Sequence, residues 1–385
     1  LVGNEDFVKL LNGGLGPDSD KAVIVLWDLP DNTHHDFVRE LLLRRMRELG
    51  SEPNLPRSVI DEADSASNEI RFDVKVSSNA NQPLMIKCGL ILTEKRDWKG
   101  KGSVVVADWF KDRLRELMSK GSPVYVVIIC EKNLYDDLFM KGYLFNAINE
   151  LRDYVEGNLH VPFIELNTAS ITKSIAAESI EFAYLINGIK PPEKLPDTFD
   201  KAFGNALIQY KSRLGEIAEN KYYVFVDRDK NESPEHIMLK TFIYYYLVKK
   251  KFDGNLKDAM DKIRTEYQVC NGVRADVVLL NDKSSYEIYE VETLFGEGTF
   301  SFKKVQESIM KYRDCSDSKI HVHVVLEPLT ATMHLNELWD IMNYINMLKK
   351  NGKISFEVSI ETIDVDNEEL IPLNDFIKKL GTALP

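Results

Sequence analysis

The chain has 385 residues, of which 44% are hydrophobic and 29% charged, a composition typical of folded proteins and not of disordered ones. Its formal net charge of -12 disfavours indiscriminate coating of nucleic acid, which depends on clustered Lys and Arg. The length favours two domains, each with its own hydrophobic core.

The four cysteines lie far apart in the sequence and form no CxxC pair, which argues against a zinc ribbon and against a disulfide scaffold. These cysteines are Cys88, Cys130, Cys270 and Cys315. The apolar run VYVVIIC at 124–130 has the length of a strand and falls far short of the roughly 20 residues of a membrane helix. We therefore expect a cytoplasmic protein with no membrane partner.

The first half of the chain alternates short apolar runs with longer amphipathic segments. The predicted strands are 22–27, 69–76, 84–93, 104–109, 124–130 and a short one at 161–166, and the predicted helices are 36–49, 135–155 and 171–187. This order predicts an α/β layer domain over residues 1–190. The proline-rich stretch 187–200 has no periodic pattern and predicts a linker.

The second half begins with a predicted helix at 200–218 and a predicted strand at 222–227. The next predicted helix lies within 233–250. Ser233 is placed to cap its N-terminus, and Pro234 fits its first turn. The remaining predicted helices are 257–266, 301–312 and 333–349, and the remaining strands are 273–280, 286–293, 319–328 and 354–363. The sequence therefore predicts helix, hairpin, helix and strand in succession.

Three acidic residues of the predicted hairpin are placed to converge. Glu290 and Glu292 are two apart in a strand and share a face, and Asp276 lies across from them if the strands pair antiparallel. Neighbouring carboxylates repel one another unless a cation lies between them, and Mg²⁺ prefers such oxygen ligands. A bound ion would lower the pKa of a water and stabilise a phosphate under attack. The alternative is that these acids decorate a solvated strand face.

The ordered set of acids resembles the PD-(D/E)xK nuclease superfamily, which has the restriction-endonuclease-like fold. In this resemblance Glu235, at the start of a helix, corresponds to the acid of the first helix, and Asp276 to the strand Asp. Glu290 corresponds to the first acid of the (D/E)xK doublet. Gln306 and Tyr312, on the following helix, resemble the Gln and Tyr of the superfamily, although at a wider spacing.

The resemblance covers roughly residues 220 to 330 and implies that residues 191–385 form a restriction-endonuclease-like α/β/α domain with a mixed central sheet. It implies a Mg²⁺-dependent or Mn²⁺-dependent endonuclease that hydrolyses phosphodiester bonds, with DNA favoured over RNA, in prokaryotic defence or DNA processing. Asp276, Glu290 and Glu235 would bind the metal. A homodimer is expected where both strands of a duplex are cut.

The superfamily's lysine position is occupied by Glu292, which cannot donate positive charge. Three interpretations remain open. Glu292 acts as a further metal ligand or as a general base, or Lys303 or Lys304 on the next helix takes the lysine's place, or the site is inactive. His236, beside Glu235, could also approach a metal or a phosphate, although one histidine at a helix start is a weak signal.

Two other functions fit the same sequence. The domain over residues 191–385 could be a catalytically degenerate nuclease fold that serves as a scaffold for nucleic acid or protein. Alternatively, residues 1–190 could hold a sensor pocket for a nucleotide signal that releases the nuclease, as in defence effectors. Otherwise the first domain would recognise a DNA sequence or another protein.

Overall fold

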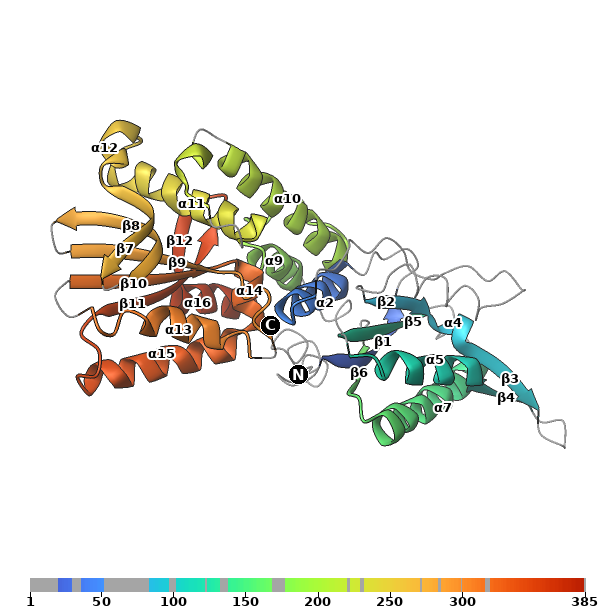
Figure 1. Cartoon of the computed structure of the whole chain (residues 1–385). Helices are drawn as coiled ribbons and strands as arrows, with labels where there is room; N and C mark the ends of the chain where they lie inside the picture. The colour runs from blue at the N-terminus through green and yellow to red at the C-terminus, as the bar shows by residue number, and fades with distance from the viewer. Residues whose placement is uncertain are drawn as a thin grey trace. The chain divides into compact units, whose positions relative to one another are not determined.

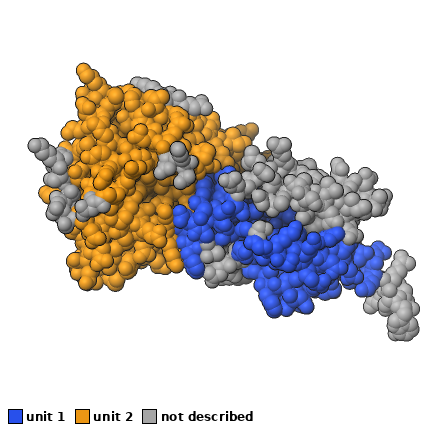
Figure 2. Space-filling model, in the orientation of Figure 1, with its two compact units in different colours: residues 1–175, 295–301 blue, residues 176–294, 302–385 orange. Residues whose placement is uncertain are grey.

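The computed structural model describes residues 20–29, 36–51, 83–96, 102–121, 123–131, 138–167, 177–219, 222–228, 232–270, 272–282, 285–298, 300–315 and 319–383. The chain divides into two compact units (Figure 2). Unit 1 comprises residues 1–175 and 295–301, and unit 2 comprises residues 176–294 and 302–385. The predicted strand at 69–76 and the start of the predicted helix at 171–187 lie outside the described residues.

The division differs from the predicted boundary between residues 190 and 191. Helix α9 (Ala177–Leu185) belongs to unit 2 because it packs against α10 (Phe199–Glu219) and α16 (Leu373–Ala383). The predicted linker therefore lies inside unit 2. Gly188, just after α9, has a φ of +64° and approaches the carbonyl of Ile363 so closely that a Cβ there would lie 2.6 Å from its oxygen.

Unit 1 contains a parallel sheet with strand order β2-β5-β1-β6 (Figure 1). The strands are β1 (Lys21–Leu29), β2 (Leu84–Lys87), β5 (Val124–Glu131) and β6 (Phe163–Asn167), and β3 (Leu92–Arg96) pairs with β4 (Gly102–Val106) as a separate hairpin. The helices are α2 (Asp36–Glu48), α4 (Cys88–Ile91), α5 (Asp108–Met118) and α7 (Leu138–Tyr154), which continues as a π-helical turn (Val155–Leu159). The α/β layer predicted for this half is confirmed in these elements.

Alternate residues of the central strands form the core of unit 1. Val23 and Val25 of β1 are buried in one hydrophobic cluster with Val126 of β5. Phe110 and Leu114 of α5 belong to the same cluster and are fully buried. Residues two apart in a strand share a face, and the intervening residues Ile24 and Leu26 are buried too, so both faces of this parallel sheet are covered.

Unit 2 is built on a mixed six-stranded sheet with strand order β12-β11-β10-β9-β8-β7 (Figure 1). The strands are β7 (Ile263–Cys270), β8 (Val273–Asp282), β9 (Ser285–Glu292), β10 (Lys319–Leu326), β11 (Glu357–Asp364) and β12 (Glu369–Pro372). The first three pair antiparallel, whereas β9, β10 and β11 are parallel to one another. The mixed α/β class with a mixed central sheet is therefore confirmed for this half.

Helices cover both faces of this sheet. Besides α9, α10 and α16 they are α11 (Pro234–Lys251), α12 (Leu256–Met260), α13 (Lys303–Met310), α14 (Pro328–Met333) and α15 (Leu335–Lys350). Helix α11 packs over β8 and β9, and α13 packs over β9 and β10 on the other side of the sheet (Figure 1). As predicted, Ser233 caps α11, because its Oγ accepts the N–H of His236 at 3.1 Å.

Two predicted elements of this half are wrong. The helix predicted at 257–266 ends at Met260, and β7 begins at Ile263. Ile263 and Thr265 are buried with exposed Arg264 between them, so the strand does alternate, but the charged residues that precede it obscure the change of period. The strand predicted at 222–227 is a 3₁₀ turn at Tyr223–Phe225. Within the described residues no helix is long and apolar enough to cross a membrane.

Candidate functional site

The antiparallel pairing of β8 with β9 brings the acids of the hairpin together. Val277 lies opposite Tyr289 and Val278 opposite Ile288, so Asp276 and Glu290 directly adjoin the last paired residues of the two strands. The backbone N–H of Val291 donates to Asp276 Oδ2 at 2.7 Å. Glu292 is two residues after Glu290 and projects to the same face. Asp276, Glu290 and Glu292 therefore converge on one part of the sheet.

Asp276 also meets His236 from the first turn of α11, next to Glu232 in the segment just before that helix. His236 Nε2 lies 3.5 Å from Asp276 Oδ2 and 3.4 Å from Glu232 Oε1. One ligand atom from each of these three residues lies within 4.8 Å of the others, so the group could hold a metal ion. His236 Nε2 is buried and has no hydrogen-bond partner among the described residues, which suits a nitrogen that ligates a metal. We call Glu232, His236 and Asp276 the metal-binding group.

A buried lysine holds the metal-binding group in place. Lys240, one turn beyond His236 on α11, has a side chain with no exposed surface. Its Nζ donates to Glu232 Oε1 at 2.7 Å, to Glu266 Oε1 at 2.5 Å and to the carbonyl of Asp227 at 3.1 Å. Burial by itself would lower the pKa of Lys240, but the two carboxylates outweigh it and raise the pKa. The lysine therefore stays charged and fixes Glu232.

Asp276 and His236 shift each other's pKa in opposite directions. Burial by itself would raise the pKa of Asp276, but His236, the Val291 N–H and Lys240 together lower it. Burial would likewise lower the pKa of His236, yet the carboxylates of Asp276 and Glu232 raise it. Without a metal, the imidazolium therefore takes the place of a cation beside Asp276.

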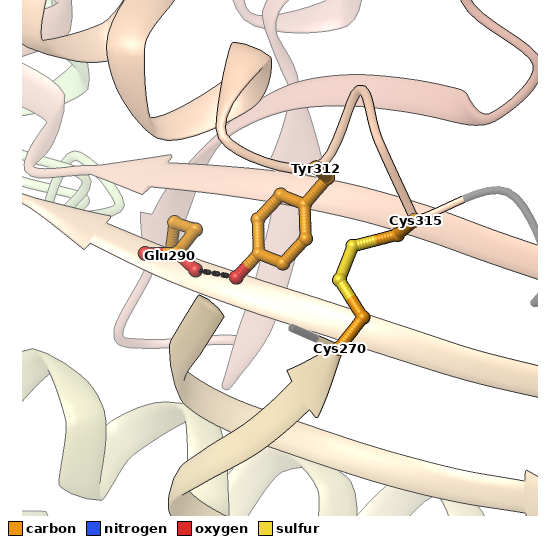
Figure 3. Close-up of a disulfide and its surroundings, with 4 residues drawn as sticks. All are labelled: Cys270, Glu290, Tyr312 and Cys315. Atoms are coloured by element: carbon orange, nitrogen blue, oxygen red, sulfur yellow. Dashed lines mark hydrogen bonds between the residues drawn. A yellow bond between two sulfur atoms is a disulfide. The ribbon is translucent and has the colours of Figure 1, made fainter. Parts of the chain in front are cut away.

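Glu290 is buried and has both oxygens occupied. Lys311 Nζ donates to Glu290 Oε2 at 2.8 Å, and the hydroxyl of Tyr312 donates to Glu290 Oε1 (Figure 3). Burial and the nearby charge of Asp276 raise the pKa of Glu290, and the two donors oppose that rise. Lys311 and Tyr312 directly follow α13, so the end of this helix covers the second acid of the hairpin.

Glu292 lies in a separate environment on the same face. Burial raises its pKa from 4.5 to about 7, aided by the charge of Asp276 and opposed by a hydrogen bond from Ser308 and by the positive charge of Lys304. A carboxyl that titrates near neutral pH is suited to accept a proton. Of the interpretations of Glu292, that of a general base therefore fits its surroundings.

The remaining predicted site residues lie at the margin of this cluster. Glu235 lies in the first turn of α11 and is half-buried, but the metal-binding group contains Glu232 and His236 in its place. Lys303 is the exposed first residue of α13. Gln306 is half-buried and is not among the donors to Glu290 or Glu292, which are Lys311, Tyr312 and Ser308.

The sequence alone pointed only weakly to several residues of the site or missed them. Glu232, His236 and Lys240 recur at intervals of four residues, the spacing that brings side chains to one side of a helix. That spacing was the available signal for Glu232 and Lys240. Lys311 adjoins Tyr312 in the sequence, but nothing in its position indicates a contact with Glu290.

Two of the four cysteines form a single disulfide, which the sequence did not indicate. Cys270, at the end of β7, is joined to Cys315, which follows α13, with a Cα separation of 5.8 Å (Figure 3). The two residues are 45 positions apart, and only the fold brings them together. Cys88 and Cys130 are free and buried in unit 1.

Comparisons with protein-family models, with curated proteins and with solved structures gave no match for this chain. The function must therefore be argued from the chemistry of the site itself.

The raised pKa of Glu292 predicts how stability depends on pH. A folded pKa of about 7 against an ordinary value of 4.5 means that the unfolded chain loses this proton first as the pH rises. Wild type should therefore lose about 3 kcal/mol of stability between these two values relative to Glu292→Gln, which cannot titrate. Urea unfolding of both chains at several pH values measures the difference. A difference independent of pH would contradict the assignment.

Proposed function

We propose that the chain is a metal-dependent nuclease that hydrolyses phosphodiester bonds through the site in unit 2. The observation that carries this proposal is the metal-binding group of Glu232, His236 and Asp276 beside the buried acids Glu290 and Glu292, on both of which the charge of Asp276 acts. Asp276 belongs to both sets. The arrangement combines ligands for a cation with a carboxyl that can take up a proton.

The order of elements supports a restriction-endonuclease-like identity for unit 2. Helix α11, strands β8 and β9 and helix α13 occur in this order along the chain, and they contribute His236, Asp276, Glu290 with Glu292, and Ser308, respectively. This is the order in which the PD-(D/E)xK pattern distributes its residues. In this proposal the first acid comes from Glu232, with His236 beside it, and not from Glu235.

Each residue of the site has a distinct proposed role. A divalent ion held by the metal-binding group would stabilise negative charge on the phosphate and lower the pKa of its bound water. Glu292 accepts the proton of the attacking water, because its pKa of about 7 leaves it partly ionised at neutral pH. Lys311 and Lys304 supply positive charge near the place where the phosphate would bind.

The ligand chemistry favours Mn²⁺ over Mg²⁺. Mg²⁺ takes oxygen ligands almost exclusively, whereas the metal-binding group offers two carboxylates and an imidazole nitrogen. Mn²⁺ accepts both kinds of donor. DNA is the first proposed substrate, as the resemblance to the PD-(D/E)xK superfamily implies, and RNA is the alternative.

The first prediction from this function concerns Asp276. Wild type is incubated with plasmid, single-stranded DNA and RNA, each with Mg²⁺, Mn²⁺ or EDTA. We expect cleavage that requires metal and that Asp276→Ala abolishes, because this change removes a ligand shared by both parts of the site. The matched control is Asp340→Ala, because Asp340 is an exposed acidic residue of α15. This variant should cleave like wild type.

No cleavage of any substrate with any metal would contradict the nuclease proposal. Retained binding of nucleic acid in that case would favour the degenerate scaffold.

The rate of cleavage should depend on pH through Glu292. Because the ionised form is the base, kcat/KM should rise as the pH increases through about 7 and then level off. In Glu292→Gln the rate should fall by a factor of about 100 or more, and this rise should disappear. Asp340→Ala serves again as the control. A wild-type profile retained in Glu292→Gln would exclude this residue as the base.

His236 should determine which metal the site prefers. Isothermal titration of the full chain should give tighter binding of Mn²⁺ than of Mg²⁺. His236→Ala should weaken Mn²⁺ binding about 10-fold to 100-fold and change Mg²⁺ binding little, because only the nitrogen ligand is lost. Equal losses for both ions, or none for Mn²⁺, would show that the imidazole does not ligate the metal.

A further inference from the structure

The disulfide between Cys270 and Cys315 anchors the turn at 311–315, which follows α13 and covers Glu290. Cys315 lies three residues after Tyr312, and its N–H donates to the carbonyl of Tyr312 at 3.1 Å. The N–H of Lys311 donates to Glu307 at 3.0 Å, so the turn continues directly from α13. Its far end is bonded to Cys270 on β7, the edge strand of the sheet. The turn is therefore held at one end by a helix and at the other by a covalent bond.

The same turn occupies the oxygens of Glu290. Lys311 contacts Oε2 and Tyr312 contacts Oε1, and Figure 3 shows Tyr312 between the disulfide and Glu290. The ammonium of Lys311, 2.8 Å from Oε2, already compensates the charge of Glu290 and repels a second cation that approaches the same carboxylate. While the disulfide is intact, Glu290 is therefore held by Lys311 and Tyr312, although it is close enough to Asp276 for the charge of Asp276 to raise its pKa.

We propose that the Cys270–Cys315 disulfide is a redox latch, and that its reduction by a dithiol of the thioredoxin class frees Lys311 and Tyr312 from Glu290 and raises nuclease activity. This inference rests on the proposed function. Removal of the covalent bond leaves the turn held only by α13 and by the hydrogen bonds of Lys311 and Tyr312. Glu290 then becomes available to the metal and its bound water.

The reduction is a two-step exchange between thiols and the disulfide. A thiolate of the dithiol attacks Sγ of Cys270, which is half-buried, and displaces Cys315 Sγ, which belongs to a residue only 6% exposed. Cys315 leaves as a thiolate and takes a proton. The second thiolate of the dithiol then attacks the mixed disulfide and releases Cys270. The protein gains two electrons and two protons, and the dithiol becomes a disulfide.

The experiment compares the full chain oxidised and reduced with a dithiol, with the state of the cysteines verified by intact mass. Hydrogen exchange of residues 303–315 measures the turn, and cleavage of DNA with Mn²⁺ measures activity. We expect faster exchange in this segment after reduction and about a tenfold rise in cleavage, because Glu290 is then free to join the ligands of the metal.

Two variants separate the latch from general effects of the reductant. Cys270→Ser should exchange and cleave like the reduced wild type and should not respond to the dithiol. Cys88→Ala, which alters a free cysteine of unit 1, should keep the full response. A response to the dithiol that persists in Cys270→Ser would assign the effect to another group and overturn the latch.

The outcomes also distinguish the latch from the nuclease proposal. Absence of the disulfide in the oxidised protein, unchanged exchange of residues 303–315, or equal or lower cleavage after reduction overturns the latch and leaves the nuclease function untouched. Faster exchange with no cleavage in either state, for any metal or substrate, overturns the nuclease function and with it the activating role of the latch.

Discussion

Repulsion among buried carboxylates is the constraint on which the site of unit 2 depends. Asp276 and Glu290 adjoin the end of the antiparallel pairing of β8 with β9, Glu266 comes from β7, and Glu232 lies just before α11. Buried carboxylates at such distances are stable only if cations or donors lie between them. Lys240 takes this role for Glu232 and Glu266, and Lys311 takes it for Glu290.

The negative charge of Asp276 is compensated less completely than that of the other acids. Beside Asp276 the positive charge comes from His236, whose Nε2 lies at distances too long for a full hydrogen bond. An imidazole whose pKa is raised only by its acidic neighbours gives up its proton when a stronger cation binds in the same place. The metal-binding group, Glu292 and the turn at 311–315 that covers Glu290 are therefore parts of one electrostatic arrangement centred on Asp276.

Much of the fold could be predicted from the sequence because the spacing of hydrophobic residues indicates which positions of a helix or strand are buried. The period-two runs of β8 and β9 and the capped start of α11 were sufficient to place Asp276, Glu290 and Glu292 together. What could not be predicted depends on contacts between distant segments. The neutralisation of Glu290 by Lys311 and the pairing of Cys270 with Cys315 arise because α13 returns over the sheet, and neither leaves a pattern in the chain. The edge strand β7 was predicted as helix because the charged residues that precede it obscure the change of period.

The most direct test of this account is the position of a bound ion. Anomalous scattering from a crystal of the full chain soaked in Mn²⁺ locates the metal without reference to activity. The account predicts a peak within ligand distance of Asp276 and His236, with Glu232 as the third ligand. A peak elsewhere in unit 2, or no peak at Asp276 in a crystal that binds Mn²⁺ at another place, would contradict it.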